Sequence, residues 1–102
     1  MPDARRTAGP GWRLLDVLQR VDEWIELESP DIDIRLIVGE WLLSRFDDPY
    51  AGMRREEGFD DLWFGAVPNT QRDGSVVGCS YFVRQRTRTG TCDRIATLAL
   101  PI

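Results

Sequence analysis

The chain has 102 residues, of which 42% are hydrophobic and 29% charged, and its net charge at pH 7 is −4. This length fits one domain and excludes a second full one, and the 10% of aromatic residues excludes disorder throughout. No apolar run approaches the roughly 18 residues that a membrane helix needs. No charged-then-apolar leader is present either, so we expect a cytoplasmic protein without a membrane partner.

The basic residues are all arginine, because the 13 cations include no lysine, and the chain also lacks histidine. These absences exclude a catalytic triad built on imidazole and a lysine-dependent P-loop or Schiff base. Residues 1–61 carry 15 acids and 8 arginines, whereas residues 62–102 carry 2 acids and 5 arginines. An acidic total charge disfavours non-specific binding to DNA, so we expect no DNA partner.

The N-terminal part begins with residues 1–9, which are polar and predict a flexible tail before a single domain over 10–102. Gly9-Pro10 is typical of a helix start and predicts a helix over 10–27. Apolar residues follow at three- and four-residue steps along this segment and predict one buried stripe. The stripe consists of Leu14, Val17, Leu18, Val21, Trp24 and Ile25.

A second helix is predicted over 30–46, because Ser29-Pro30 repeats the start signal. One side of this helix carries five apolar residues: Ile34, Ile37, Val38, Trp41 and Leu42. The opposite side also carries Ile32, Leu36 and Leu43. A helix that is apolar nearly all round is buried on more than one side, so we expect it to lie between the first helix and a sheet.

The second half of the chain predicts strands. Residues 52–61 are polar and predict a loop, residues 62–67 predict a buried strand, and 76–85 and 91–100 predict a hairpin.

If Gly90 takes a left-handed conformation in a bulged turn, Arg84 faces Arg94, and Cys79 and Cys92 point to opposite faces. This register predicts unbonded cysteines, with Cys92 the more accessible thiol. A rival two-residue turn at 85–86 would place Cys79 opposite Cys92, but it lacks any Gly, Asn or Asp.

The predicted fold class is therefore α+β, with two N-terminal helices packed on one face of a small three-stranded antiparallel sheet. Such a sheet leaves two edges open, where a second copy or a partner protein could pair.

The candidate binding residues lie on the predicted hairpin. They are Arg84, Arg86, Arg94, Phe82 and Tyr81. Forked guanidinium groups suit phosphate or carboxylate, and an outward Phe82 beside arginines could stack on an RNA base. The alternative is an ordinary solvated sheet face, which the residues favour.

Three pairs of acids, at 47–48, 56–57 and 60–61, lack the ligand spacing of a calcium loop. We therefore expect no metal and no cofactor. The two cysteines are too few for a disulfide scaffold and, without histidine, form no zinc signature.

Several segments resemble toxins of the RelE/ParE type from toxin–antitoxin systems, over about residues 38–98. They are VGEWLLSRFDDPYAG, GFDDLWFGAVP, VVGCSYFV and DRIATL. The resemblance implies a related fold, and Arg84, Arg94 and Tyr81 are the residues that would carry over as site residues. The active nucleases of that family are basic and use Arg, Lys, His or Tyr, whereas this chain is acidic and lacks two of those four residue types.

We therefore interpret the protein as an interaction module, a non-catalytic relative of RelE/ParE toxins that binds a protein partner or a second copy of itself. The alternative is a ribonuclease toxin that cuts mRNA with the arginine-rich sheet face. RNA is thus a second candidate partner, less favoured than protein. A third possibility is a small-ligand pocket beneath Trp41 and Trp63, although no polar residues converge there.

Overall fold

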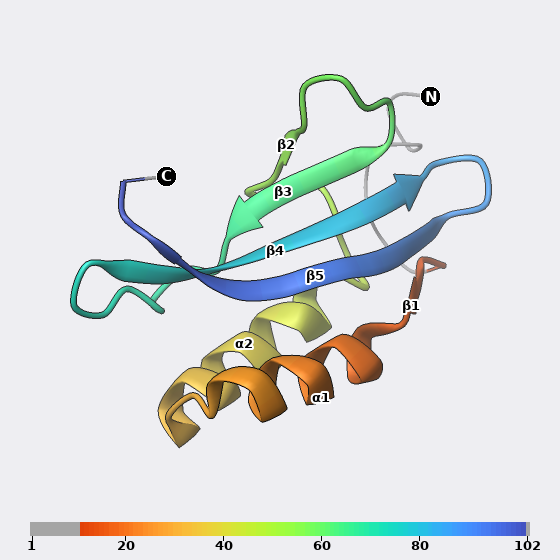
Figure 1. Cartoon of the computed structure of the whole chain (residues 1–102). Helices are drawn as coiled ribbons and strands as arrows, with labels where there is room; N and C mark the ends of the chain where they lie inside the picture. The colour runs from red at the N-terminus through yellow and green to blue at the C-terminus, as the bar shows by residue number, and fades with distance from the viewer. Residues whose placement is uncertain (1–10, 102) are drawn as a thin grey trace.

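The computed structural model describes residues 11–101, in two helices and five strands (Figure 1). In chain order the elements are β1 (Arg13–Leu15), α1 (Val17–Glu28), α2 (Ile32–Ser44), β2 (Arg54–Arg55), β3 (Leu62–Ala66), β4 (Ser75–Arg84) and β5 (Thr89–Ala99). The tail predicted for residues 1–9 lies outside the described residues. Neither helix combines the length and the apolar character needed to cross a membrane.

The sheet has five strands in the order β1-β5-β4-β3-β2. β1 runs parallel to β5, and every other neighbouring pair is antiparallel. Both helices lie on one face of this sheet (Figure 1). The α+β class is confirmed, but the predicted three-stranded antiparallel sheet is wrong, because β1 and β2 extend it at its two edges and β1 makes it mixed.

The first helix is shorter than predicted because its expected first turns form β1. Asp16 has a φ of 62°, and this left-handed residue separates β1 from α1, while Gly11 has a φ of 110° just before the strand. Leu14 pairs with Gly90 across the parallel strands. A Cβ atom at Gly90 would lie 3.1 Å from Leu14 Cδ2, so the glycine allows this close approach and does not form the predicted bulged turn.

The second helix packs on one side only. Ile34, Val38 and Leu42 are buried beneath the sheet, and Trp41 is half-buried. The three apolar residues of the opposite side, Ile32, Leu36 and Leu43, are each 67% exposed. The prediction of a helix enclosed on two sides is therefore wrong: the sheet covers one side, and no described segment covers the other.

The start signal assigned to Ser29 is also wrong. Ser29 ends α1 in a left-handed conformation with a φ of 46°, and its N–H donates to the Ile25 carbonyl at 2.8 Å. Asp31 is the residue that precedes α2. The serine thus belongs to the end of one helix and not to the beginning of the next.

The hairpin strands are confirmed, but both predicted registers are wrong. The turn spans residues 85–88, with Arg88 at a φ of 52° and its N–H bonded to the Gln85 carbonyl at 3.2 Å. Tyr81 pairs with Cys92, but the next residue, Ser80, pairs with Arg94, so Asp93 is an extra residue that forms a β-bulge. The bulge is needed because Cys92 and Ile95 are both buried although three positions separate them.

The predicted loop over 52–61 contains the two residues of β2, which pair with Trp63 and Phe64 of β3. The chain before it is well packed. Tyr50 stacks edge-on against Trp63 at a ring distance of 4.9 Å and against Trp12 at 5.8 Å. The Tyr50 hydroxyl also donates to Gln85 Oε1 at 2.8 Å, which joins this segment to the hairpin turn. The aromatic cluster, rather than any local strand signal, therefore holds the edge of the sheet.

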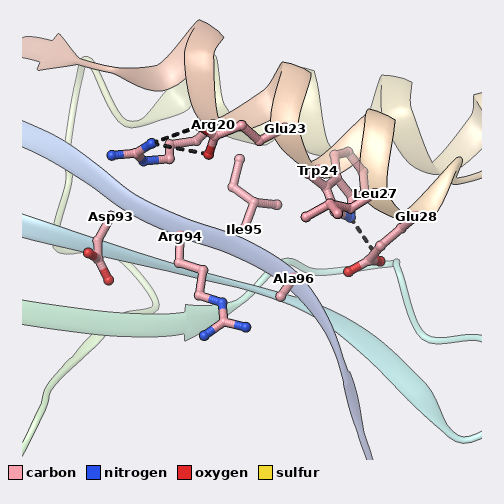
Figure 2. Close-up of a pocket in the computed structure, with 9 residues that line it drawn as sticks. All are labelled: Arg20, Glu23, Trp24, Leu27, Glu28, Asp93, Arg94, Ile95 and Ala96. Carbon is pink, nitrogen blue, oxygen red and sulfur yellow. Dashed lines mark hydrogen bonds and ion pairs between the residues drawn. The ribbon is translucent and has the colours of Figure 1, made fainter.

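Glu28 joins the end of α1 to β5. Its carboxylate accepts hydrogen bonds from Trp24 Nε1 at 3.1 Å, from the Thr97 N–H at 3.1 Å and from the Thr97 hydroxyl. Trp24 is 1% exposed, and the carboxylate of the exposed Glu28 covers its indole N–H. The close-up in Figure 2 shows Glu28 beside Trp24 above β5.

We expect Glu28→Ala to lower the free energy of unfolding by about 2 kcal/mol, because it removes charged hydrogen bonds to the Trp24 indole and to Thr97. Urea unfolding followed by tryptophan fluorescence measures this change. Glu26→Ala, an exposed acid on the same helix, is the matched control and should change stability by less than about 0.5 kcal/mol. Equal effects of the two substitutions would contradict this role of Glu28.

Candidate functional site

The predicted binding residues do not form one site. Phe82, Arg84 and Arg94 lie on the outer face of the sheet, which we define as the face away from the helices. Arg84 and Arg94 are exposed and Phe82 is half-buried. Figure 2 shows Arg94 extending from β5 away from α1, whereas the neighbouring Ile95 points toward the helix. Tyr81 lies on the opposite, inner face and is 0% exposed.

The arginines of the hairpin are also dispersed along it. Arg84 pairs with Thr89 and Arg94 with Ser80, so the predicted facing of Arg84 and Arg94 is wrong. Four positions along β4 separate their rows, or roughly 13 Å at the rise of a strand. Arg84 Nε donates to Asp61 Oδ2 at 3.1 Å, and Arg86 lies in the exposed turn. These guanidinium groups therefore do not converge on a single phosphate.

Tyr81 instead belongs to a closed polar cluster in the core. Its hydroxyl has no hydrogen-bond partner among the described residues. Burial raises the pKa of this hydroxyl well above its usual value, and the neighbouring thiols of Cys79 and Cys92 add to the rise. A phenol in this environment remains protonated and cannot act as a general base near neutral pH.

The two cysteines lie on the same inner face, with their Sγ atoms 4.0 Å apart, and both are free. The prediction that they point to opposite faces is wrong, as is the expectation of an accessible Cys92, which is 0% exposed. A hydrogen bond with the Cys92 thiol and burial both raise the pKa of Cys79. The Cys79 thiol is therefore protonated and poorly nucleophilic, and Cys92 is closed off from solvent by burial.

Arg45 completes this part of the interior and is 5% exposed. Its Nη1 donates to the Ala51 carbonyl at 2.5 Å, and its guanidinium lies 4.3 Å from the Trp41 ring centre. Burial lowers the pKa of Arg45, although an arginine stays charged in these conditions. Sequence patterns did not mark this residue, which connects the end of α2 to the following loop.

The third predicted possibility, a pocket shared by Trp41 and Trp63, is not formed. Trp41 lines a shallow hollow with Ile37, Glu40 and residues of the β3–β4 loop, whereas Trp63 is absent from it and packs against Tyr50. Within residues 11–101, no three acidic or cysteine side chains come close enough together to hold a metal ion.

The helices also carry exposed apolar side chains, and this apolar surface was not predicted. We define the α2 stripe as Ile32, Leu36 and Leu43, each 67% exposed. On α1, Leu18 is 79% and Leu27 84% exposed. The signal was present in the sequence as a helix that is apolar nearly all round, but it was interpreted as a second buried side.

This apolar surface lies in an acidic part of the chain. Residues 16–48 contain ten acids and three arginines, for a net charge of −7. Arg45 is one of these arginines and is buried, and Arg20 is paired with Glu23 at 3.1 Å. The helix layer therefore combines exposed leucine and isoleucine side chains with a strongly negative net charge.

Comparison with family models, with curated proteins and with solved structures finds no match to this chain. The resemblance to RelE/ParE toxins therefore stays a prediction from the residues.

We expect Tyr81→Phe to leave stability unchanged or to raise it by about 1 kcal/mol, because it removes a buried hydroxyl without a partner. The substitution should also reduce the decline in the free energy of unfolding that we expect as the pH rises above about 8. The raised pKa values of Tyr81 and Cys79 keep both groups protonated when folded, whereas the unfolded groups ionise near their usual values of about 10 and about 8.5. Stability is then complete below about pH 8 and falls above it.

Urea unfolding at several pH values from neutral to about pH 10.5 measures both effects. In the wild type the free energy of unfolding should decline as the pH rises, and Tyr81→Phe should remove the phenol's share of that decline. A loss of more than about 1 kcal/mol in Tyr81→Phe at neutral pH would show that the hydroxyl has a stabilising partner.

We expect neither thiol to react rapidly with a thiol reagent such as Ellman's reagent in the folded protein at pH 8, since both are fully buried. Both should react immediately after unfolding in denaturant without reductant. One fast-reacting thiol in the native state would indicate an open path to Cys79 or Cys92.

Proposed function

We propose that this protein is an interaction module that binds a basic amphipathic helix of a partner protein on the α2 stripe. The observation that carries the proposal is the 67% exposure of all three stripe residues on a helix whose other side is buried. Exposed apolar surface of this kind, rimmed by polar groups, is typical of protein interaction sites.

The spacing of the stripe suits a helix as the partner. Ile32, Leu36, Gly39 and Leu43 follow one another at steps of four, three and four, which places them on one side of α2. A Cβ atom built at Gly39 has no neighbour within 4 Å, so the backbone is open at the middle of the stripe. Apolar side chains on both sides of a small residue can receive the side chains of a helix laid against them.

The charge of the helix layer favours a basic partner over a second copy. Residues 16–48 carry a net charge of −7, and a symmetric pairing of two such faces would bring like charges together. A helix with leucines on one side and arginines or lysines at its margins would instead place positive charge next to exposed acids such as Glu40 and Glu26. Complementary charge also speeds the encounter between partners.

The ribonuclease alternative has weaker support. Arg84 is engaged with Asp61, and the Tyr81 hydroxyl is sealed in the core. Transition-state stabilisation of a phosphate requires several groups aimed at one point, and the hairpin arginines are dispersed along its length.

Two synthetic helical peptides test the proposal, one with leucine at three- and four-residue steps and lysine at the positions between, and the other with each lysine replaced by glutamate. We expect the basic peptide to bind, as measured by fluorescence anisotropy, and the acidic peptide to bind at least tenfold more weakly. Leu36→Gln and Leu43→Gln should each weaken binding about tenfold, the loss typical of an interface anchor.

Leu27→Gln is the matched control, because Leu27 is 84% exposed but lines the hollow between α1 and β5 instead of the α2 stripe. It should leave peptide binding unchanged. Sedimentation of the free protein supplies a second measurement, and we expect a monomer. A dimer that Leu36→Gln dissociates would replace the proposed helical partner by a second copy, and equal binding of both peptides would refute the role of charge.

A further inference from the structure

The outer face of the sheet carries an ordered arrangement of side chains that the proposed function does not use. The pairing places Arg54, Phe64, Ser80 and Arg94 in one row across four strands. The adjacent row contains only small residues: Ala66, Gly78 and Ala96. Beyond it, Val76 pairs with Leu98. Large side chains on both sides of a row of small ones leave a depression in the sheet surface.

This depression is a hollow of about 240 Å³ with an apolar lining. The Leu98 and Phe64 side chains meet over Gly78, because a Cβ atom there would lie 2.7 Å from Leu98 Cδ1 and 3.1 Å from the Phe64 ring. These two side chains form the apolar side of the hollow, and Arg94 and Ala96 of β5 also line it. Its volume equals that of roughly eight water molecules, at about 30 Å³ each. A phenyl ring with a short side arm is of this size.

Arg94 contributes a positive charge to the lining of this hollow. Its side chain is exposed, extends over the outer face in Figure 2, and makes no hydrogen bond or ion pair with the described residues. Arg54 stands over the Phe64 ring at 5.8 Å and adds a second cation to the same row. A guanidinium group without a partner can bind a carboxylate through two parallel hydrogen bonds.

Asp93 is the nearby acid on this part of β5. It does not line the hollow, and its Oδ2 accepts a hydrogen bond from the Ser80 hydroxyl at 3.0 Å. Two arginines and one carboxylate therefore border the row, so that the local charge favours an anion although the whole chain is acidic.

We propose that this hollow binds a small aryl carboxylate, with the ring packed on the apolar side formed by Phe64 and Leu98 and the carboxylate on Arg94. The aromatic ring of the ligand would pack against Phe64 and cover apolar surface that is now in contact with water. The acid group would supply the partner that the Arg94 guanidinium lacks. This site lies on the face of the sheet opposite to α2 and is independent of the proposed helix docking.

The probe that tests the site is 3-phenylpropanoate, with 3-phenylpropanamide as its neutral counterpart, titrated into ¹⁵N-labelled full-length protein. We expect the carboxylate to shift the amide signals of Gly78 and Ala96 and the amide to bind at least fivefold more weakly. Arg94→Gln should weaken binding of the carboxylate five- to tenfold and abolish the preference for it over the amide.

Arg86→Gln is the control, because it removes the same charge from an exposed turn outside the hollow. It should leave the affinity unchanged. Gly78→Ala supplies a second variant, since its added methyl group would displace Leu98 and Phe64 from their positions beside the hollow and reduce binding, with folding checked by circular dichroism. Equal weakening by Arg86→Gln and Arg94→Gln, or equal binding of carboxylate and amide, would overturn the proposal. So would a short oligouridylate that binds the same residues more tightly, which would indicate an RNA surface.

Discussion

The bulge at Asp93 is the constraint on which the arrangement of the sheet depends. Cys92 and Ile95 are both buried against the helices, although three positions separate them and a regular strand would turn one of them outward. The extra residue resolves this conflict, and it sets the register of β4 against β5 on each side of itself. The contact between Cys79 and Cys92, and the position of Arg94 opposite Ser80, follow from that register.

The structure has one layer of helices on one layer of sheet, so two faces remain uncovered by the described residues. On the helix side the uncovered surface is apolar and surrounded by acids, and on the sheet side it is a small apolar hollow beside arginines. A thin fold of this kind cannot bury every apolar side chain of a helix that is apolar all round. The exposed remainder is therefore the surface available for binding, which is why the proposed function and the proposed ligand site lie on opposite sides.

The interior shows why the most reactive residue types of the chain do not form an active site. Tyr81, Cys79, Cys92 and Arg45 are at most 5% exposed. Burial favours the protonated form of the phenol, and the hydrogen bond with Cys92 together with burial favours that of the Cys79 thiol. Glu28, at the end of α1, has a structural role. Its carboxylate accepts hydrogen bonds from the buried Trp24 indole and from the Thr97 N–H of β5. Polar groups in this protein thus connect elements to one another, and the surfaces suited to binding are mainly apolar.

Local patterns in the sequence determined the class of the fold and most of its elements. The three- and four-residue apolar spacing identified both helices, and the runs over 62–67, 76–85 and 91–100 identified the three long strands, because these periods reflect which side of an element is buried.

Tertiary structure decided the rest. β1 and β2 are only three and two residues long and exist through pairing with β5 and β3. The spacing of Cys92 and Ile95 was a visible signal for the bulge, but the register also required the left-handed Arg88, a conformation that nothing in the local sequence demands. Whether the second side of α2 met another layer or solvent depended on how many layers the chain forms, and a helix's own residues carry no information about that number.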